Sequence, residues 1–138
     1  MIRTMHIGMV LMLISLTLSG CGEEKEKWTW NSMEVTATAY NSLASQTNAL
    51  ANIAAWGDTL SPGMKCIAVS RDLLKKGLKY NTPVKIEGFE GVYLVKDKMN
   101  KRWENRIDIY MGNDVEKARE WGRKKVTIQY GTLKEDQK

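Results

Sequence analysis

Short segments that alternate apolar and polar residues run along most of the chain and predict β-strands. Residues 35–40 alternate valine and alanine with threonine, a β-branched residue that suits a half-buried strand. A compact apolar run at residues 66–70 predicts a second strand. Further strands are predicted at residues 82–87, 91–95, 106–110 and 125–130. The strands before and after Gly88 form a predicted hairpin.

Two segments have helical features instead. Residues 113–122 carry an apolar stripe of valine, alanine and tryptophan at helical spacing, with Asn113 as the expected cap and a glycine at the end. Residues 72–77 indicate a single helical turn closed by glycine. Five or six short strands with one or two short helices predict a mainly β fold, a small barrel rather than a layered α/β sheet.

The first twenty residues have the architecture of an export signal. Arg3 precedes an apolar stretch at residues 7–18, and small residues lead to Cys21 and a charged segment. The stretch of twelve apolar residues would cover only about 18 Å as a helix, well short of the roughly 30 Å hydrocarbon layer. We therefore expect residues 1–20 to be cleaved rather than kept as a membrane anchor.

The cleavage region also predicts a lipid anchor. Leucine, two small residues and cysteine resemble the bacterial lipobox, in which the cysteine thiol receives diacylglycerol before cleavage. Cys21 would then carry several acyl chains, and one chain alone binds membranes only marginally. An aspartate after the cysteine favours inner-membrane retention in Gram-negative sorting, whereas this chain has Gly22. We expect an outer-membrane lipoprotein that faces the periplasm.

The mature chain is predicted to hold one domain. We expect a tether at residues 21–33, the domain at residues 34–131 and a polar tail at residues 132–138. Without the signal the formal charge is about +4, from interspersed charges. Such a surface favours an anionic partner such as peptidoglycan or lipid headgroups, and it does not imply nucleic acid.

The composition restricts the available chemistry. The one histidine, His6, lies in the predicted signal, so histidine-assisted nucleophiles and ordinary zinc sites are excluded from the mature chain. We expect no metal and no other cofactor. Once Cys21 is lipidated, Cys66 cannot form an intramolecular disulfide, and its apolar neighbours predict a buried core thiol. An enzyme of this composition would use carboxylates for proton transfer, with lysine or tyrosine as substitutes.

Three aspartates are candidates for that role. Asp97 follows a predicted strand, and Asp108 lies within one, on the opposite face from Ile107 and Ile109. Asp108 would therefore face solvent or a cleft, and an exposed carboxylate paired with a nearby lysine or arginine is the alternative interpretation. Asp58 is the third candidate, although a glycine-aspartate pair is also typical of a turn.

Aromatic and basic residues could bind a sugar substrate. Tyr40 and Trp56, like Trp103 and Tyr110, could stack on pyranose rings, and packing in the core or at a strand edge is the alternative for each. Lys98 and Arg102, with Lys101 between them, could hold anionic groups of the substrate, or belong to an ordinary solvated loop.

The order of these motifs resembles the three-aspartate (3D) domain family. That family is related to the catalytic domain of membrane-bound lytic transglycosylase A and, more distantly, to the rare lipoprotein A domains. The resemblance covers roughly residues 34–130, with Asp97 and Asp108 eleven residues apart as in the transglycosylase pattern. It is carried by residues 35–40, 67–70, 84–88, 93–97, 107–110 and 118–122. The resemblance implies a six-stranded double-psi β-barrel that cleaves the MurNAc–GlcNAc bond of peptidoglycan without a metal.

The resemblance also implies roles for single residues. Asp108 matches the proposed catalytic acid, and Asp97 matches the second aspartate of the cleft. The first aspartate of the family falls at Ser70, so Asp72 or Asp58 would have to replace it. The loop at residues 98–105 lacks the glycine-rich, threonine-containing sequence of the family, and substrate contacts there are expected to differ.

The leading hypothesis is a lytic transglycosylase that acts on peptidoglycan glycan strands by aspartate general acid/base catalysis. The main alternative is a non-catalytic peptidoglycan-binding lipoprotein with a degenerate active site. A structural accessory of an envelope complex is a third possibility.

Overall fold

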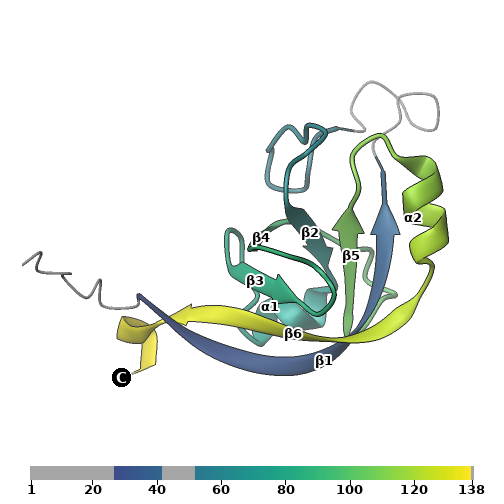
Figure 1. Cartoon of the computed structure of the whole chain (residues 1–138). Coiled ribbons are helices and arrows are strands. Elements are labelled where there is room, and N and C mark those ends of the chain that lie inside the picture. Colours follow the sequence, from purple (N-terminus) through teal and green to yellow (C-terminus); the bar gives the residue numbers. More distant parts are fainter. Residues whose placement is uncertain (1–26, 42–51, 138) are drawn as a thin grey trace, which may run out of the picture.

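Figure 1 shows the computed structural model of the chain, which describes residues 27–41 and 52–137. The predicted signal peptide and the lipidation site at Cys21 lie outside these residues. Within the described part of the chain, no helix is both long and apolar enough to cross a membrane.

The described residues form a closed barrel of six strands with two short α-helices. The strands are β1 (Trp28–Tyr40), β2 (Cys66–Val69), β3 (Pro83–Ile86), β4 (Tyr93–Lys98), β5 (Arg106–Tyr110) and β6 (Lys124–Leu133). The helices are α1 (Arg71–Lys75) and α2 (Val115–Trp121), and a 3-10 helix follows at Lys134–Gln137. The predicted mainly β, six-stranded barrel is confirmed.

The barrel mixes parallel and antiparallel pairs in the order β1-β5-β2-β4-β3-β6. Strand β1 runs parallel to β5, and β2 runs parallel to β4, while the other pairs are antiparallel. Strand β5 lies between the consecutive strands β1 and β2, and β2 lies between β4 and β5. Such crossed connections in a closed six-stranded barrel fit a double-psi β-barrel.

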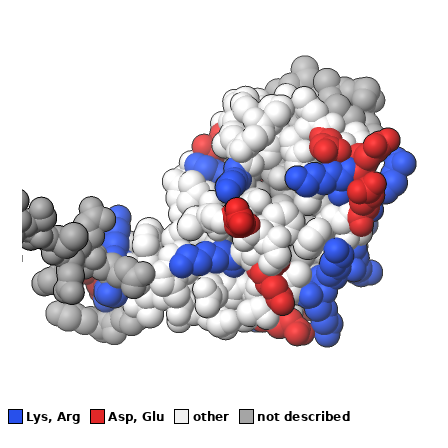
Figure 2. Space-filling model, in the orientation of Figure 1, with Lys and Arg blue, Asp and Glu red and all other residues white. Residues whose placement is uncertain are grey.

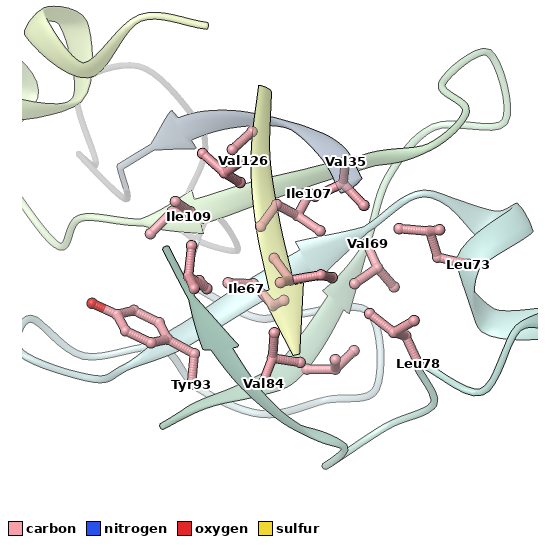
Figure 3. Close-up of a cluster of buried hydrophobic side chains, with 14 residues drawn as sticks. Val35, Ile67, Val69, Leu73, Leu78, Val84, Tyr93, Ile107, Ile109 and Val126 are labelled. Carbon is pink, nitrogen blue, oxygen red and sulfur yellow. The ribbon is translucent and has the colours of Figure 1, made fainter. Parts of the chain in front are cut away.

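Aliphatic side chains fill the barrel interior, as strand alternation predicts. Ile107 and Ile109 of β5 are almost completely buried and meet residues of five other strands in one cluster (Figure 3). Each fully buried side chain of this size contributes about 1.5–3 kcal/mol relative to an exposed one. Because Ile107 and Ile109 point inward, the residue between them must point out of the barrel.

Strand β1 is longer than the sequence pattern predicts. It pairs with β6 from Trp28 opposite Leu133 to Ala37 opposite Lys124, and the two strands run side by side beyond the rest of the barrel (Figure 1). We call this two-stranded extension, residues 28–33 of β1 paired with residues 128–133 of β6, the arm. Residues 28–33, assigned in the sequence analysis to a tether before Glu34, thus belong to β1. The last two residues of β6 likewise fall in the polar tail predicted from residue 132.

Two element boundaries also differ from the prediction. The side chain that caps α2 belongs to Asp114, which accepts a hydrogen bond from the Lys117 N–H at 2.9 Å, so the predicted Asn113 cap is wrong by one residue. Strand β4 continues through Lys98, which places Asp97 inside a strand rather than after it.

Charges of both signs are scattered over the face seen in Figure 2, in agreement with the interspersed pattern of the sequence.

Candidate active site

Four small or polar residues lie in one row across four neighbouring strands. Asp108 of β5 is opposite Thr38 of β1 on one side and opposite Ala68 of β2 on the other. Ala68 is in turn opposite Asp97 of β4. The strand register thus brings together the two aspartates that the sequence singled out, with an alanine between them that leaves open space.

A β-bulge gives Asp97 its place in this row. Ile67 pairs with Val95, but Ala68 pairs with Asp97, so Lys96 is an extra residue on β4. Val95 is fully buried, and strict alternation would turn Asp97 inward as well. The bulge interrupts the alternation and leaves Asp97 half-buried at the surface, which is how bulges re-aim side chains near functional sites.

The carboxyl group of Asp108 is half-buried and protonates more readily than an ordinary aspartate. Burial is the main cause and raises its pKa, and the negative charge of Asp97 raises it further. Two partners act in the opposite direction: the Thr38 hydroxyl donates to Oδ1 at 2.9 Å, and Arg106 supplies positive charge. The net effect is a pKa above the ordinary value, the direction that a general acid requires.

Asp97 holds a loop in position. Its Oδ1 accepts hydrogen bonds from the N–H of Ala55 at 2.8 Å and of Lys98 at 2.9 Å. Asp97 and Asp108 are two strands apart, which separates their Cα atoms by roughly 10 Å. The two hydrogen bonds that Asp97 accepts from backbone N–H groups indicate a carboxylate that positions its surroundings.

The two aspartates line a cleft of about 210 Å³. The loop after β4 forms one wall, and Tyr40 forms part of the opposite side. The lining residues are Tyr40, Ala68, Asp97, Lys98, Met99, Asn100, Trp103 and Asp108. Of the residues that the sequence singled out, Tyr40, Asp97, Lys98, Trp103 and Asp108 are therefore brought together.

Tyr40 lines the cleft with a ring that packs on a neighbouring tyrosine and a hydroxyl that is buried. Its ring packs against Tyr110 with centroids 5.4 Å apart. Its hydroxyl is buried and has no hydrogen-bond partner among the described residues. Burial, and then negative charge at Cys66, Asp97 and Asp108, raise the pKa of Tyr40 strongly, so the hydroxyl keeps its proton.

Trp103 supplies the aromatic face of the cleft. The Arg106 guanidinium lies 3.8 Å from the centroid of the Trp103 ring, and that of Arg102 lies 4.8 Å away. These stacked cations fix the ring beside Asp108. Arg102, predicted to bind substrate, acts on the cleft only through Trp103 and does not itself line it.

Asp58 and Trp56 lie outside the cleft. The Asp58 carboxylate is paired with Lys96 Nζ at 3.4 Å, so the structure does not bring Asp58 to Asp108 as the prediction of a catalytic role requires. Trp56 stands at the edge of the cleft, where Lys98 Nζ lies 5.3 Å from its ring. Its side chain is 36% exposed, which leaves ring surface open to a ligand.

Ser70, the position at which the resemblance would place a first aspartate, is also outside the cleft. Ser70 is completely buried at the end of β2, where its Oγ accepts a hydrogen bond from the Arg106 N–H at 2.9 Å. Asp72 lies on α1 and accepts from the Asn105 N–H at 3.0 Å, so it does not take a place in the cleft. Both side chains support the start of β5.

The sequence reasoning missed Thr38, Ala68, Met99 and Asn100. Alternation does put Thr38 on the same face of β1 as Tyr40, which is the one signal that could have found it. Cys66 is buried as predicted, and burial raises its pKa to about 11, so it is no nucleophile. Among the described residues, no group of three or more histidine, cysteine or acidic side chains could hold a metal ion.

Comparisons with known proteins assign no family. No protein-family model matches the chain, and no curated protein matches its sequence. An apo structure of an expansin from Clavibacter michiganensis aligns with 18% identity and a TM-score of 0.47, over 72% of this chain and 50% of that chain. A mutant Clavibacter michiganensis expansin in complex with cellohexaose aligns with 17% identity and a TM-score of 0.42, over 74% and 50%. The chain thus spans about half the length of these expansin chains, and at these values the likeness carries no functional conclusion.

Proposed function

We propose that this protein is a lipid-anchored enzyme of the cell envelope that cleaves MurNAc–GlcNAc bonds of peptidoglycan, with Asp108 as general acid and base. One observation carries the proposal: Asp108 lies in an aromatic-lined cleft where burial raises its pKa. The resemblance of the motif order to the three-aspartate family supports the same chemistry. The outer membrane is the proposed location, because Gly22 follows the predicted lipidation site at Cys21.

The proposed reaction needs only one carboxyl group. Protonated Asp108 donates its proton to the glycosidic oxygen as the C1–O bond breaks, and GlcNAc leaves with a free hydroxyl. The Asp108 carboxylate then accepts the proton of the muramic C6 hydroxyl while that oxygen bonds to C1. The product is a 1,6-anhydro sugar, no water is consumed, and Asp108 returns to its starting protonation state.

The other cleft residues would bind and orient the sugar. The Tyr40 hydroxyl can donate a hydrogen bond to a sugar oxygen or an N-acetyl carbonyl, because it holds its proton and has no partner of its own among the described residues. The Trp103 ring suits the C–H face of a pyranose. Lys98 provides positive charge for a muramic carboxylate at the edge of the cleft.

A non-catalytic glycan-binding lipoprotein is the second candidate. The hydrogen bond from Thr38 stabilises the ionised form of Asp108, and a carboxylate that remains ionised binds hydroxyl groups without donating a proton. The two candidates therefore differ in whether the protonated form of Asp108 is reached on the bound glycan.

Product analysis of purified murein sacculi separates the candidates. The chain without residues 1–21 is incubated with sacculi, and soluble and insoluble fragments are identified by mass spectrometry. We expect 1,6-anhydro ends, which establish a transglycosylase. New reducing ends would indicate a hydrolase, and intact glycan to which the protein sediments would indicate the binder.

A further inference from the structure

A second and larger cavity lies beside the arm. Its volume is about 500 Å³, against about 210 Å³ for the cleft. We call it the arm cavity. Its walls combine the rings of Trp28, Tyr80 and Tyr130 with the basic side chains of Lys76 and Lys79. A cavity of this size falls within the range of small-ligand sites in proteins.

The arm cavity is built from anchored parts. Gly131 lets the Trp28 ring lie against β6, since a Cβ at that position would come within 3.1 Å of the ring and 2.9 Å of Pro83. The loop between α1 and β3 is tied to the barrel by the fully buried Leu78 and by a 2.8 Å hydrogen bond from the Asn81 N–H to the Val95 carbonyl. The cavity therefore exists before any ligand binds, which lowers the entropic cost of binding.

Two exposed aromatic rings connect the arm cavity with the cleft. Tyr80 lines the arm cavity, and its ring centroid lies 5.3 Å from that of Trp56. Lys98 has its Nζ 5.3 Å from the Trp56 ring and also lines the cleft. We call Trp56 and Tyr80 the aromatic bridge. Both rings remain open to a ligand, with 36% and 40% of their side chains exposed.

Asp58 and Asp97, two of the three aspartates that the sequence offered as candidate catalytic residues, keep the aromatic bridge in place. Asp58 holds Lys96 at 3.4 Å, and Lys96 Nζ lies 4.8 Å from the Tyr80 ring. Asp97 holds the backbone of Ala55, the residue before Trp56, at 2.8 Å. Asp58 thus acts on the aromatic bridge as a positioning residue, through Lys96.

We propose that the arm cavity is a second glycan subsite, which takes sugars of the same peptidoglycan strand whose scissile bond lies in the cleft. The proposal rests on the proposed function and adds the direction in which the strand extends. Aromatic rings suit the apolar faces of successive pyranoses, and the two lysines suit the carboxylates that muramic acid and its peptides carry. A lipid headgroup would match the lysines alone, but it would leave the continuity between the two cavities unexplained.

The consequence is a dependence on chain length. A short glycan that fills only the cleft cannot reach Tyr80 or Lys79, whereas a longer strand gains contacts at both. We expect kcat/KM to rise by about tenfold or more from short to long strands, the factor that about 1.4 kcal/mol of added binding supplies.

The experiment compares glycan oligomers of increasing length with three variants. Tyr80→Ala and Lys79→Ala remove exposed side chains of the arm cavity. Lys85→Ala is the matched control. The Lys85 side chain lines neither the arm cavity nor the cleft, and its Nζ lies 4.2 Å from the centroid of the Trp30 ring. Unchanged melting temperatures establish that each variant is folded. Binding to vesicles of phosphatidylglycerol is measured in parallel.

We expect Tyr80→Ala and Lys79→Ala to lose the advantage of long strands and to keep the wild-type rate on short ones, while Lys85→Ala behaves as wild type. An undiminished length dependence in both variants overturns the subsite and leaves the proposed function intact. Vesicle binding that Lys79→Ala abolishes, with glycan cleavage unchanged, assigns the cavity to lipid and also overturns it. A wild-type protein that neither binds nor cleaves glycan of any length overturns both proposals.

Discussion

Replacing Asp108 with asparagine tests the central residue of the proposed mechanism. The amide has the shape of the carboxyl group, and its oxygen can still accept the hydrogen bond that Thr38 donates at 2.9 Å. It cannot donate a carboxylic proton to the glycosidic oxygen. General acid catalysis supplies about 10²–10⁴-fold, so the barrier should rise by about 2.7–5.4 kcal/mol.

The same substitution should not weaken the fold. Burial raises the pKa of Asp108 above its ordinary 3.8, so the folded protein binds this proton more tightly than the unfolded chain does. The wild-type free energy of unfolding therefore falls as the pH rises from 3.8 through the folded pKa. Asparagine does not titrate. The Asp108→Asn variant should be at least as stable as wild type at neutral pH, and this difference should shrink as the pH is lowered towards 3.8.

The assay combines three measurements on wild type and Asp108→Asn. Release of anhydro-muropeptides from sacculi gives the rate, cosedimentation with sacculi gives glycan binding, and thermal melting at several pH values gives stability. Near-normal turnover by the variant would show that Asp108 is not the acid. A variant that fails to fold would show that Asp108 is a structural residue, and the reasoning from its pKa would be wrong.

Four further predictions follow from the site and the chain start. Thr38→Val removes the hydroxyl that stabilises ionised Asp108, so the pKa of Asp108 should rise. The alkaline limb of the pH profile of kcat/KM should then move to higher pH. An unmoved limb would mean that another group titrates there. Asp97→Ala removes the acceptor of the Ala55 N–H, so it should lower the melting temperature by about 5 °C and should also lower kcat/KM. Asp97→Asn keeps an acceptor and should have a milder effect. Equal effects of the two variants would contradict the positioning role. Cys21→Ser replaces the thiol that is predicted to receive diacylglycerol, so the protein should lose the lipid label and stay out of the membrane fraction. Labelled protein in membranes would refute the predicted anchor. EDTA should leave activity unchanged, because no metal-binding cluster is present among the described residues; activity lost with EDTA and restored by zinc or manganese would disprove this.

Local periodicity explains which parts of the fold could be read from the sequence. Strand alternation placed Ile107 and Ile109 inside and Asp108 outside, and apolar neighbours placed Cys66 in the core. These are properties of a few consecutive residues and of the backbone geometry of a strand. They hold whichever strands become neighbours.

The boundary errors occurred where that periodicity fails. Residues 28–33 show no sustained alternation because both faces of the arm are partly exposed, so neither face needs to be apolar. The cap of α2 was assigned one residue too early because asparagine and aspartate stand side by side, and both cap helices well. The pairing of Asp58 with Lys96 joins two distant segments, so the sequence does not show it.

The sequence by itself determined the mainly β barrel, its buried face and the choice of Asp97 and Asp108 as candidates. Only the tertiary structure brought those aspartates together in one cleft. Their common row with Thr38 and Ala68 depends on the strand order β1-β5-β2-β4, and the outward position of Asp97 depends on a bulge of one residue. The contact of Trp56 with Tyr80 likewise joins two separate loops. Pairings between distant segments follow from how the whole barrel closes, and short-range patterns carry no record of that closure.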